Sequence, residues 1–246
     1  MLELERQRAP FIVIDGTDGA GKKTQLDLLL KRLASEGVKT GVVDFPQYGT
    51  PSAHFVERYL NGQYGTLGEI GPKAASLFYA LDRFEAKQDM NSDLQRGNVL
   101  VSNRYVTASM GHQAGKIEDP KERAAYLDWL EDLEYSVLGL PRPTLQLILC
   151  MPADISQQNV DKKAARGYTD KKRDLHEEDR EHLAAAERAY RELAGRDETF
   201  TLIECAPDHC LRAIEDIHEE IWECVADHLN LKQSVSSGTL EATVAA

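Results

Sequence analysis

Long apolar runs and an excess of positive charge are both missing from this sequence of 246 residues. No apolar run approaches the roughly 20 residues of a membrane-spanning helix, and no basic-then-apolar secretory signal is present. The 29 Lys and Arg residues are outnumbered by 41 Asp and Glu, so the formal net charge is −12. Because long nucleic acid is bound through many cations, this balance argues against such a partner, whereas a nucleotide needs only a few. We expect a cytoplasmic protein that binds neither a membrane nor long nucleic acid.

Cysteine motifs are also absent. The four cysteines show no CxxC spacing and no histidine partners at zinc-binding spacing; they are Cys150, Cys205, Cys210 and Cys224. This arrangement lacks the common zinc-binding and redox patterns. It predicts reduced thiols, mostly buried, as in a cytosolic protein.

Apolar periodicity predicts an alternation of strands and helices. Short runs rich in β-branched residues predict buried strands at 11–15, 40–45, 98–102, 144–151 and 199–205. Helical spacing predicts a helix that ends at Gly37, and further helices at 72 to about 90, 121–138, 177–194 and 208–229. This order predicts an α/β fold with a mostly parallel sheet covered on both faces. We expect one domain over residues 1–232 and a flexible tail over 233–246.

The predicted helix at 121–138 is amphipathic. Its spacing places four apolar residues on the inward face: Tyr126, Leu130, Leu133 and Val137.

A glycine-rich segment directly follows the first predicted strand. It matches the pattern G-x-x-x-x-G-K, and a helix is predicted after it. Glycines allow a tight turn that points successive backbone N–H groups inward, and the helix N-terminus adds positive potential. The segment therefore predicts a phosphate loop for ATP, made of Gly16, Thr17, Asp18, Gly19, Ala20, Gly21, Lys22, Lys23 and Thr24.

Lys23 departs from this pattern, which usually has Ser or Thr at that position as a Mg²⁺ ligand. A lysine cannot ligate a cation, and the side chain of Thr24 is turned by about 100° on a helix. Mg²⁺ keeps several waters and often uses only one or two carboxylates, for which Asp15 and Asp18 are the nearest candidates. Lys23 itself either faces a phosphate or lies on the solvated surface.

Three further segments follow strands, or pack beside them, at the carboxyl edge of the predicted sheet, where α/β proteins bind ligands. They are residues 44–50, 77–83 and 102–113. Tyr79 and Arg83 are four residues apart on a helix and share a face. Arg104 comes just after a buried strand, where its guanidinium could bind a phosphate through two hydrogen bonds. An aromatic surface, base-edge donors and a cation suit a pyrimidine monophosphate.

The four segments together resemble the thymidylate kinases, over about residues 10–230. The matching motifs are D-G-x-G-K at 18–22, F-P-x-Y at 45–48, A-L-D-R at 80–83 and R-Y at 104–105. The resemblance implies a P-loop NTPase fold of three α/β/α layers, with a five-stranded parallel sheet and a mobile lid. It also implies a homodimer in which Mg²⁺-assisted transfer from ATP converts dTMP to dTDP.

The resemblance also implies residue roles. Tyr79 stacks on thymine, Arg83 binds a base carbonyl, and Arg104 binds the acceptor phosphate. Asp18 lies near the acceptor's 3′-hydroxyl and phosphate, and is our candidate metal ligand. The other expected substrate-binding residues line the same pocket, with Ser109 at the base and His112 excluding a 2′-hydroxyl: Phe45, Pro46, Tyr48, Ser109 and His112.

The sequence departs from the family pattern at a second position. Asn103 stands where many relatives have Asp, so the metal loses another usual partner.

The polar stretch at about 157–176 contains six cations within 161–174, and it follows the fourth strand, where the family places its lid. Gly19 indicates the family class that supplies catalytic cations from the lid. We expect Arg166 and Arg173 to stabilise charge on the transferring phosphoryl group, together with Lys22, Asp18 and Arg104.

Two alternatives remain open. A deoxynucleoside kinase shares the phosphate loop but needs a carboxylate base beside a neutral hydroxyl. A non-catalytic P-loop regulatory protein is the other alternative, although the guanine-reading N-K-x-D motif of GTPase switches is absent.

Overall fold

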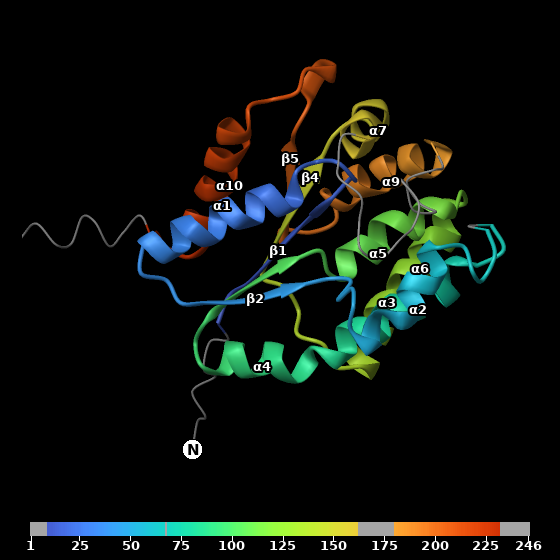
Figure 1. The fold of residues 1–246 in the computed structure, drawn as a ribbon, viewed down its shortest axis with the longest axis horizontal. Coiled ribbons are helices and arrows are strands. Elements are labelled where there is room, and N and C mark those ends of the chain that lie inside the picture. Colours follow the sequence, from blue (N-terminus) through green and yellow to red (C-terminus); the bar gives the residue numbers. More distant parts are fainter. Residues whose placement is uncertain (1–8, 67, 162–179, 232–246) are drawn as a thin grey trace, which may run out of the picture.

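A five-stranded sheet forms the centre of the computed structural model, which describes residues 9–66, 68–161 and 180–231 (Figure 1). The strands are β1 (Phe11–Gly16), β2 (Thr40–Asp44), β3 (Val99–Asn103), β4 (Leu145–Cys150) and β5 (Phe200–Glu204). Their order is β2-β3-β1-β4-β5, and every neighbouring pair is parallel. The predicted α/β class and the five-stranded parallel sheet are confirmed.

Helices cover both faces of the sheet, because the strands carry apolar side chains on both sides. Ile12 and Ile14 of β1 face one core and Phe11 and Val13 face the other. The first core is closed by α1 (Lys22–Ser35) and α10 (Ile214–His228). The second is closed by α4 (Lys87–Gln95), α5 (Val106–His112), α6 (Pro120–Glu131) and α9 (Arg180–Leu193). Figure 1 shows these as the outer layers of a three-layer fold.

Two helices pair beyond the end of the sheet, next to the second core. α2 (His54–Leu60) follows a short 3₁₀ turn, η1 (Pro51–Ala53), and packs on α3 (Pro72–Glu85). Another helix, α7 (Ala153–Asp161), follows β4. Apolar periodicity did not predict α2, α5 or α7, which have only seven, seven and nine residues. The expected lid begins inside α7, and its remaining residues lie outside the described part of the chain.

The predicted helix from 72 to about 90 is divided in two. Ala86, with φ −78° and ψ −7°, separates α3 from α4. The division leaves α3 beside α2, while α4 lies against β2 and β3.

The prediction that Val137 faces inward is wrong. α6 ends at Glu131 and continues as a π-helical turn, η3 (Asp132–Val137). A π turn needs more residues per turn than an α-helix, so it shifts which side chains face inward. Val137 is 69% exposed, whereas the charged Glu134 is fully buried.

The closing helix begins later than predicted. Residues 207–209 form a 3₁₀ turn, η4 (Pro207–His209), in which Asp208 and His209 have φ values of 50° and 58°. Left-handed backbone interrupts an α-helix, so the regular helix α10 starts only at Ile214.

All four cysteines are free thiols, but only two of the four are buried, fewer than predicted. Cys150 and Cys205 are buried, Cys224 is half-buried and Cys210 is exposed. Within the described ranges, no helix is both long and apolar enough to cross a membrane.

Candidate functional site

The phosphate loop leaves β1 through a turn that only glycine fits. Gly16 has φ 127°, and a Cβ atom there would lie 1.9 Å from the carbonyl oxygen of Leu149. At the other end of the loop, Gly21 caps α1 with φ 82° and no side-chain hydrogen bond. The first N–H groups of α1 therefore receive no side-chain cap, which is the arrangement that binds phosphate at a helix N-terminus.

Lys22 bends back over this loop. Its Nζ donates to the carbonyl oxygens of Gly16 at 2.9 Å and Thr17 at 2.8 Å, and it lies 3.9 Å from Asp18 Oδ1. The side chain is buried, so its charge sits inside the loop rather than in solvent. A lysine in this position acts as a point charge for a phosphate.

Lys23 and Thr24 point away from the loop. Both are exposed, and Lys23 Nζ forms an ion pair with Asp27 at 2.6 Å, one helical turn further on. This geometry favours the surface alternative for Lys23.

Asp18 connects the phosphate loop to the next strand. Its Oδ1 accepts a hydrogen bond from Arg104 Nη2 at 2.5 Å, and His112 Nε2 lies 3.9 Å from Oδ2. Burial is the largest single influence on the pKa of Asp18 and raises it, but the charges of Arg104 and Lys22 and the hydrogen bond from Arg104 are among the effects that together hold the pKa well below its usual value. Asp18 is thus ionised at neutral pH.

Arg104 adopts an unusual backbone conformation directly after β3. Its φ is 63°, in the left-handed region that is strained for a side chain of this size. The conformation is held by the hydrogen bond from Arg104 N to Ile14 O at 2.9 Å and by the hydroxyl of Ser102, which donates to the Arg104 carbonyl. The guanidinium is thereby aimed back toward the phosphate loop.

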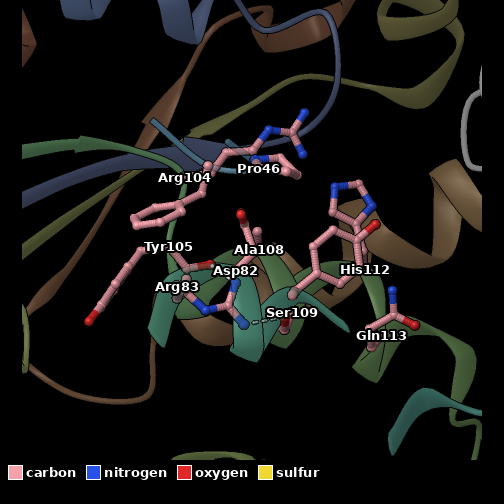
Figure 2. Close-up of a pocket in the computed structure, with 11 residues that line it drawn as sticks. Pro46, Asp82, Arg83, Arg104, Tyr105, Ala108, Ser109, His112 and Gln113 are labelled. Atoms are coloured by element: carbon pink, nitrogen blue, oxygen red, sulfur yellow. Dashed lines mark hydrogen bonds between the residues drawn. The ribbon is translucent and has the colours of Figure 1, made fainter. Parts of the chain in front are cut away.

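A pocket opens beside Arg104, where β2 and β3 end. Figure 2 shows Arg104 at one end, Arg83 with Ser109 at the other, and His112 along a side. The pocket is lined by Phe45, Pro46, Tyr79, Asp82, Arg83, Arg104, Tyr105, Ala108, Ser109, His112 and Gln113. It therefore has a cation next to the phosphate loop and a second set of polar groups at the far end.

Arg83 is fully buried at that far end. Its Nε donates to Glu134 Oε2 at 3.1 Å, and Nη2 donates to Glu134 Oε1 and to Ser109 Oγ at 3.0 Å. Nη1 donates to the carbonyl oxygen of Tyr105 at 3.1 Å. The guanidinium plane is therefore fixed by contacts from two separate parts of the chain, α5 with its N-cap residue and η3.

His112, the last residue of α5, and Gln113, directly after it, form another part of the pocket wall. His112 is buried, and burial lowers its pKa to about 3, so the ring is neutral at physiological pH. Its Nδ1 lies 3.4 Å from Nε2 of His182 on α9. Gln113 is 1% exposed, and neither atom of its amide has a hydrogen-bond partner within the described structure. A buried amide without partners is costly, and it is a strong indication of a ligand.

Of the expected substrate-binding residues, seven line the pocket and Tyr48 does not. Tyr48 is 36% exposed and lies in the loop after β2. That loop is held by the buried Asp82, whose Oδ2 accepts from Gln47 N at 2.9 Å and whose Oδ1 accepts from Ser52 Oγ at 2.6 Å. Asn103 donates through Nδ2 to Asp44 Oδ1 at 2.7 Å, and so joins the ends of β2 and β3.

The expected lid cations Arg166 and Arg173 lie outside the described residues. α7, in which the expected lid begins, contacts the phosphate loop directly: the hydroxyl of Ser156 donates to the Asp18 carbonyl, and Asn159 Nδ2 donates to the Gly19 carbonyl at 3.4 Å.

The sequence analysis missed two polar residues that line the pocket and one charged residue, Glu134, that lies behind Arg83. Gln113 directly follows His112, and Asp82 directly precedes Arg83, so both lay within quoted motifs. Glu134 gave no such signal, because regular helical spacing placed Leu133 and Val137 on the inward face and left Glu134 beside it.

A glycine-rich loop joined by an ion pair to a neighbouring pocket, on a parallel sheet covered on both faces, is typical of P-loop kinases that act on a small substrate. Comparison with known proteins makes this more specific. Residues 14–221 match the family model described as thymidylate kinase. The chain therefore belongs to the thymidylate kinase family, and the predicted family and enzyme class are confirmed.

Individual relatives agree. Thymidylate kinase of Mycobacterium tuberculosis is 30% identical over 76% of this chain and 86% of its own length. Thymidylate kinase of Afipia carboxidovorans is 28% identical over 90% and 91%. A solved structure of thymidylate kinase from Candida albicans has a TM-score of 0.68 and 22% identity, covering 91% of this chain and 93% of that one. This last likeness supports the fold.

Proposed function

We propose that this thymidylate kinase transfers the γ-phosphoryl group of ATP to dTMP, giving dTDP, in the site described above. The observation that carries the proposal is the contact between Asp18 of the phosphate loop and Arg104 of the pocket, at 2.5 Å. It joins a triphosphate cradle to a pocket with a cation at its near end. A donor phosphate in the loop and an acceptor phosphate at Arg104 would lie on the two sides of this contact, next to each other as phosphoryl transfer requires.

The transfer needs positioning and charge stabilisation rather than covalent chemistry from the protein. The amides from Gly16 to Thr24 and the Nζ of Lys22 hold the donor phosphates. Arg104 binds the acceptor phosphate, whose oxygen attacks in line. Because that oxygen is already anionic at neutral pH, no strong general base is needed. Arg166 and Arg173, in the lid, are assigned to the charge on the transferring group.

Mg²⁺ belongs to the proposal, with Asp18 as its protein ligand. The fit rests on the ionised carboxylate of Asp18 beside the loop, while Asp15 is buried and its pKa is raised by desolvation. With Lys23 and Asn103 at the other usual positions, most ligands would be phosphate oxygens and water, which Mg²⁺ accepts. When bound, the ion would offset phosphate charge.

The far end of the pocket is assigned to the base and sugar. Tyr79 offers a ring for stacking, and Arg83, Ser109 and Gln113 offer polar groups for the base edge. Phe45 and Pro46 close the wall opposite, and the neutral His112 ring faces the sugar. Tyr48 is assigned to the rim, since it lies outside the pocket lining.

A substrate panel tests this function and its rivals. Initial rates are measured with ATP, varied Mg²⁺, and dTMP, dUMP, dCMP or thymidine. We expect dTMP to be phosphorylated with the highest kcat/KM. Phosphorylation of thymidine in preference to dTMP would establish a deoxynucleoside kinase, for which Asp18, already paired with Arg104, is a poor base. No turnover of any acceptor would favour a regulatory nucleotide-binding protein.

The homodimer is also part of the proposal. Leu77, Leu81 and Phe84 recur on one face of α3 and are 43%, 50% and 44% exposed. Such a stripe suits burial against a second copy. We expect a dimer by light scattering, and Leu81→Glu should yield monomers. Unchanged dimers from that variant would place the interface elsewhere.

A further inference from the structure

Glu134 is a carboxylate in the interior of the protein. It is fully buried, and the π turn η3 turns it toward the pocket wall rather than toward solvent. Both of its oxygens accept hydrogen bonds from Arg83, in a two-point contact. Buried ion pairs of this kind contribute little net stability over an apolar pair, so stability alone is a weak explanation for it.

The contacts of Arg83 determine what it can offer a ligand. A guanidinium has five N–H donors and no acceptor. Within the described chain, four of the five have acceptors: two on Glu134, one on Ser109 and one on Tyr105. One N–H on Nη1 is left for a ligand in the pocket that Arg83 lines. Because the other four are held, this donor has a fixed direction.

Gln113 behaves in the opposite way. Its amide has a donor side and an acceptor side, and rotation by 180° exchanges them. Because neither atom is held by a described partner, Gln113 can match either pattern of donors and acceptors. Thymine has a carbonyl acceptor at C4, and cytosine has an amino donor there. Gln113 alone therefore cannot distinguish the two bases.

We propose that Glu134 is a positioning residue that makes the pocket select thymine over cytosine, by locking Arg83 as a fixed, donor-only group at the base edge. This inference rests on the proposed function. Arg83 accepts nothing, so an amino group at C4 meets a donor facing a donor. Without the lock, the guanidinium turns and the flippable amide of Gln113 decides, which removes the preference.

Removing the charge of Glu134 also leaves Arg83 buried without compensation, which destabilises a protein. A simple loss of activity would therefore not separate positioning from folding. The decisive readout is the ratio of affinities for two bases, because general destabilisation changes both alike.

The experiment compares Glu134→Gln, Glu134→Asp and the parent. Glu134→Gln removes the charge; Glu134→Asp keeps it, and so protects the fold, but retracts it by one methylene. KM and kcat are measured for dTMP, and dCMP is measured as an inhibitor, so that a value is obtained even without turnover. In both variants we expect the preference for dTMP over dCMP to fall by about tenfold or more, as for the loss of one charged hydrogen bond. The KM for dTMP should rise, with kcat and the KM for ATP changing less.

Gln146→Leu is the matched control. Gln146 is also buried and hydrogen-bonded, to Thr107 and Thr199, but it lies away from the pocket lining. It should lower the melting temperature and leave the dTMP preference unchanged. If the parent phosphorylates dTMP and both Glu134 variants keep its preference, the positioning role is overturned. If the parent does not phosphorylate dTMP, the proposed function fails and this inference fails with it.

Discussion

The two halves of the site are built by different means. The phosphate loop, from Gly16 to Thr24, is one continuous segment, and the groups that we assign to phosphate binding are mainly its backbone N–H groups and one lysine. The end of the pocket that we assign to the base is assembled from α3, α5 and η3, and its side chains are held by one another, chiefly Arg83 and Glu134. A local backbone site is specified by glycine spacing, whereas a tertiary side-chain site depends on how separate elements pack.

The sharpest test of the backbone half is Gly16→Ala. The added Cβ would lie 1.9 Å from a backbone oxygen at a residue with φ 127°. Because the backbone cannot move away without a large energetic cost, we expect a loss of more than about 4 kcal/mol in the free energy of unfolding, measured by urea denaturation.

Gly37→Ala is its control. Gly37 also has a positive φ, 74°, but nothing lies within 4 Å of the added atom. Only backbone strain of about 1–2 kcal/mol is expected there. Equal losses in the two variants would show that close approach at Gly16 is not what the loop requires.

The side-chain half should respond to pH where a backbone site does not. The pKa of His112 is lowered to about 3 by burial, below its unfolded value of about 6.5. The unfolded chain therefore takes up a proton that the folded chain refuses, and stability falls as the pH drops below about 6.5. Between pH 7 and pH 5 this group should remove about 2 kcal/mol.

His112→Asn should lack that increment, as measured by urea unfolding at the two pH values. Other histidines, such as His218 and His228, also have pKa values lowered by burial. Their contribution to the pH dependence of stability is the same in the parent and the variant, so it cancels in the comparison. The same pH dependence in parent and variant would mean that His112 is not the responsible group.

A local interaction far from both halves gives the smallest expected effect. Asp119 caps α6, accepting from the backbone N–H groups of Lys121 and Glu122 at 2.9 Å each. Asp119→Ala should cost about 1 kcal/mol by thermal unfolding, with no change in kinetics. A change in the KM for dTMP would show that α6 is coupled to the pocket more closely than its contacts imply.

The same division explains what could be predicted from the sequence. All five strands and the phosphate loop were found, because apolar runs and glycine spacing are local signals. Asp18 and Arg104 were expected near the acceptor phosphate, and the structure brings them together.

The misses follow from tertiary effects. The π turn that buries Glu134 and exposes Val137 leaves no trace in regular helical spacing. Gln113 was missed because the sequence does not show that its amide is buried, and only a buried amide without partners indicates a ligand. The late start of α10 was missed because the left-handed Asp208 and His209 look unremarkable in sequence.

Separate binding of the two substrates tests the division most directly. Calorimetric titration gives Kd values for ATP and for dTMP with the parent, Arg104→Met and Lys22→Met. We predict that Arg104→Met raises the Kd for dTMP by at least about 30-fold, as for loss of a buried charge contact, and leaves the Kd for ATP nearly unchanged. Lys22→Met should raise the Kd for ATP and leave the Kd for dTMP nearly unchanged. Unchanged dTMP affinity in Arg104→Met would contradict the assignment of the pocket to the acceptor phosphate.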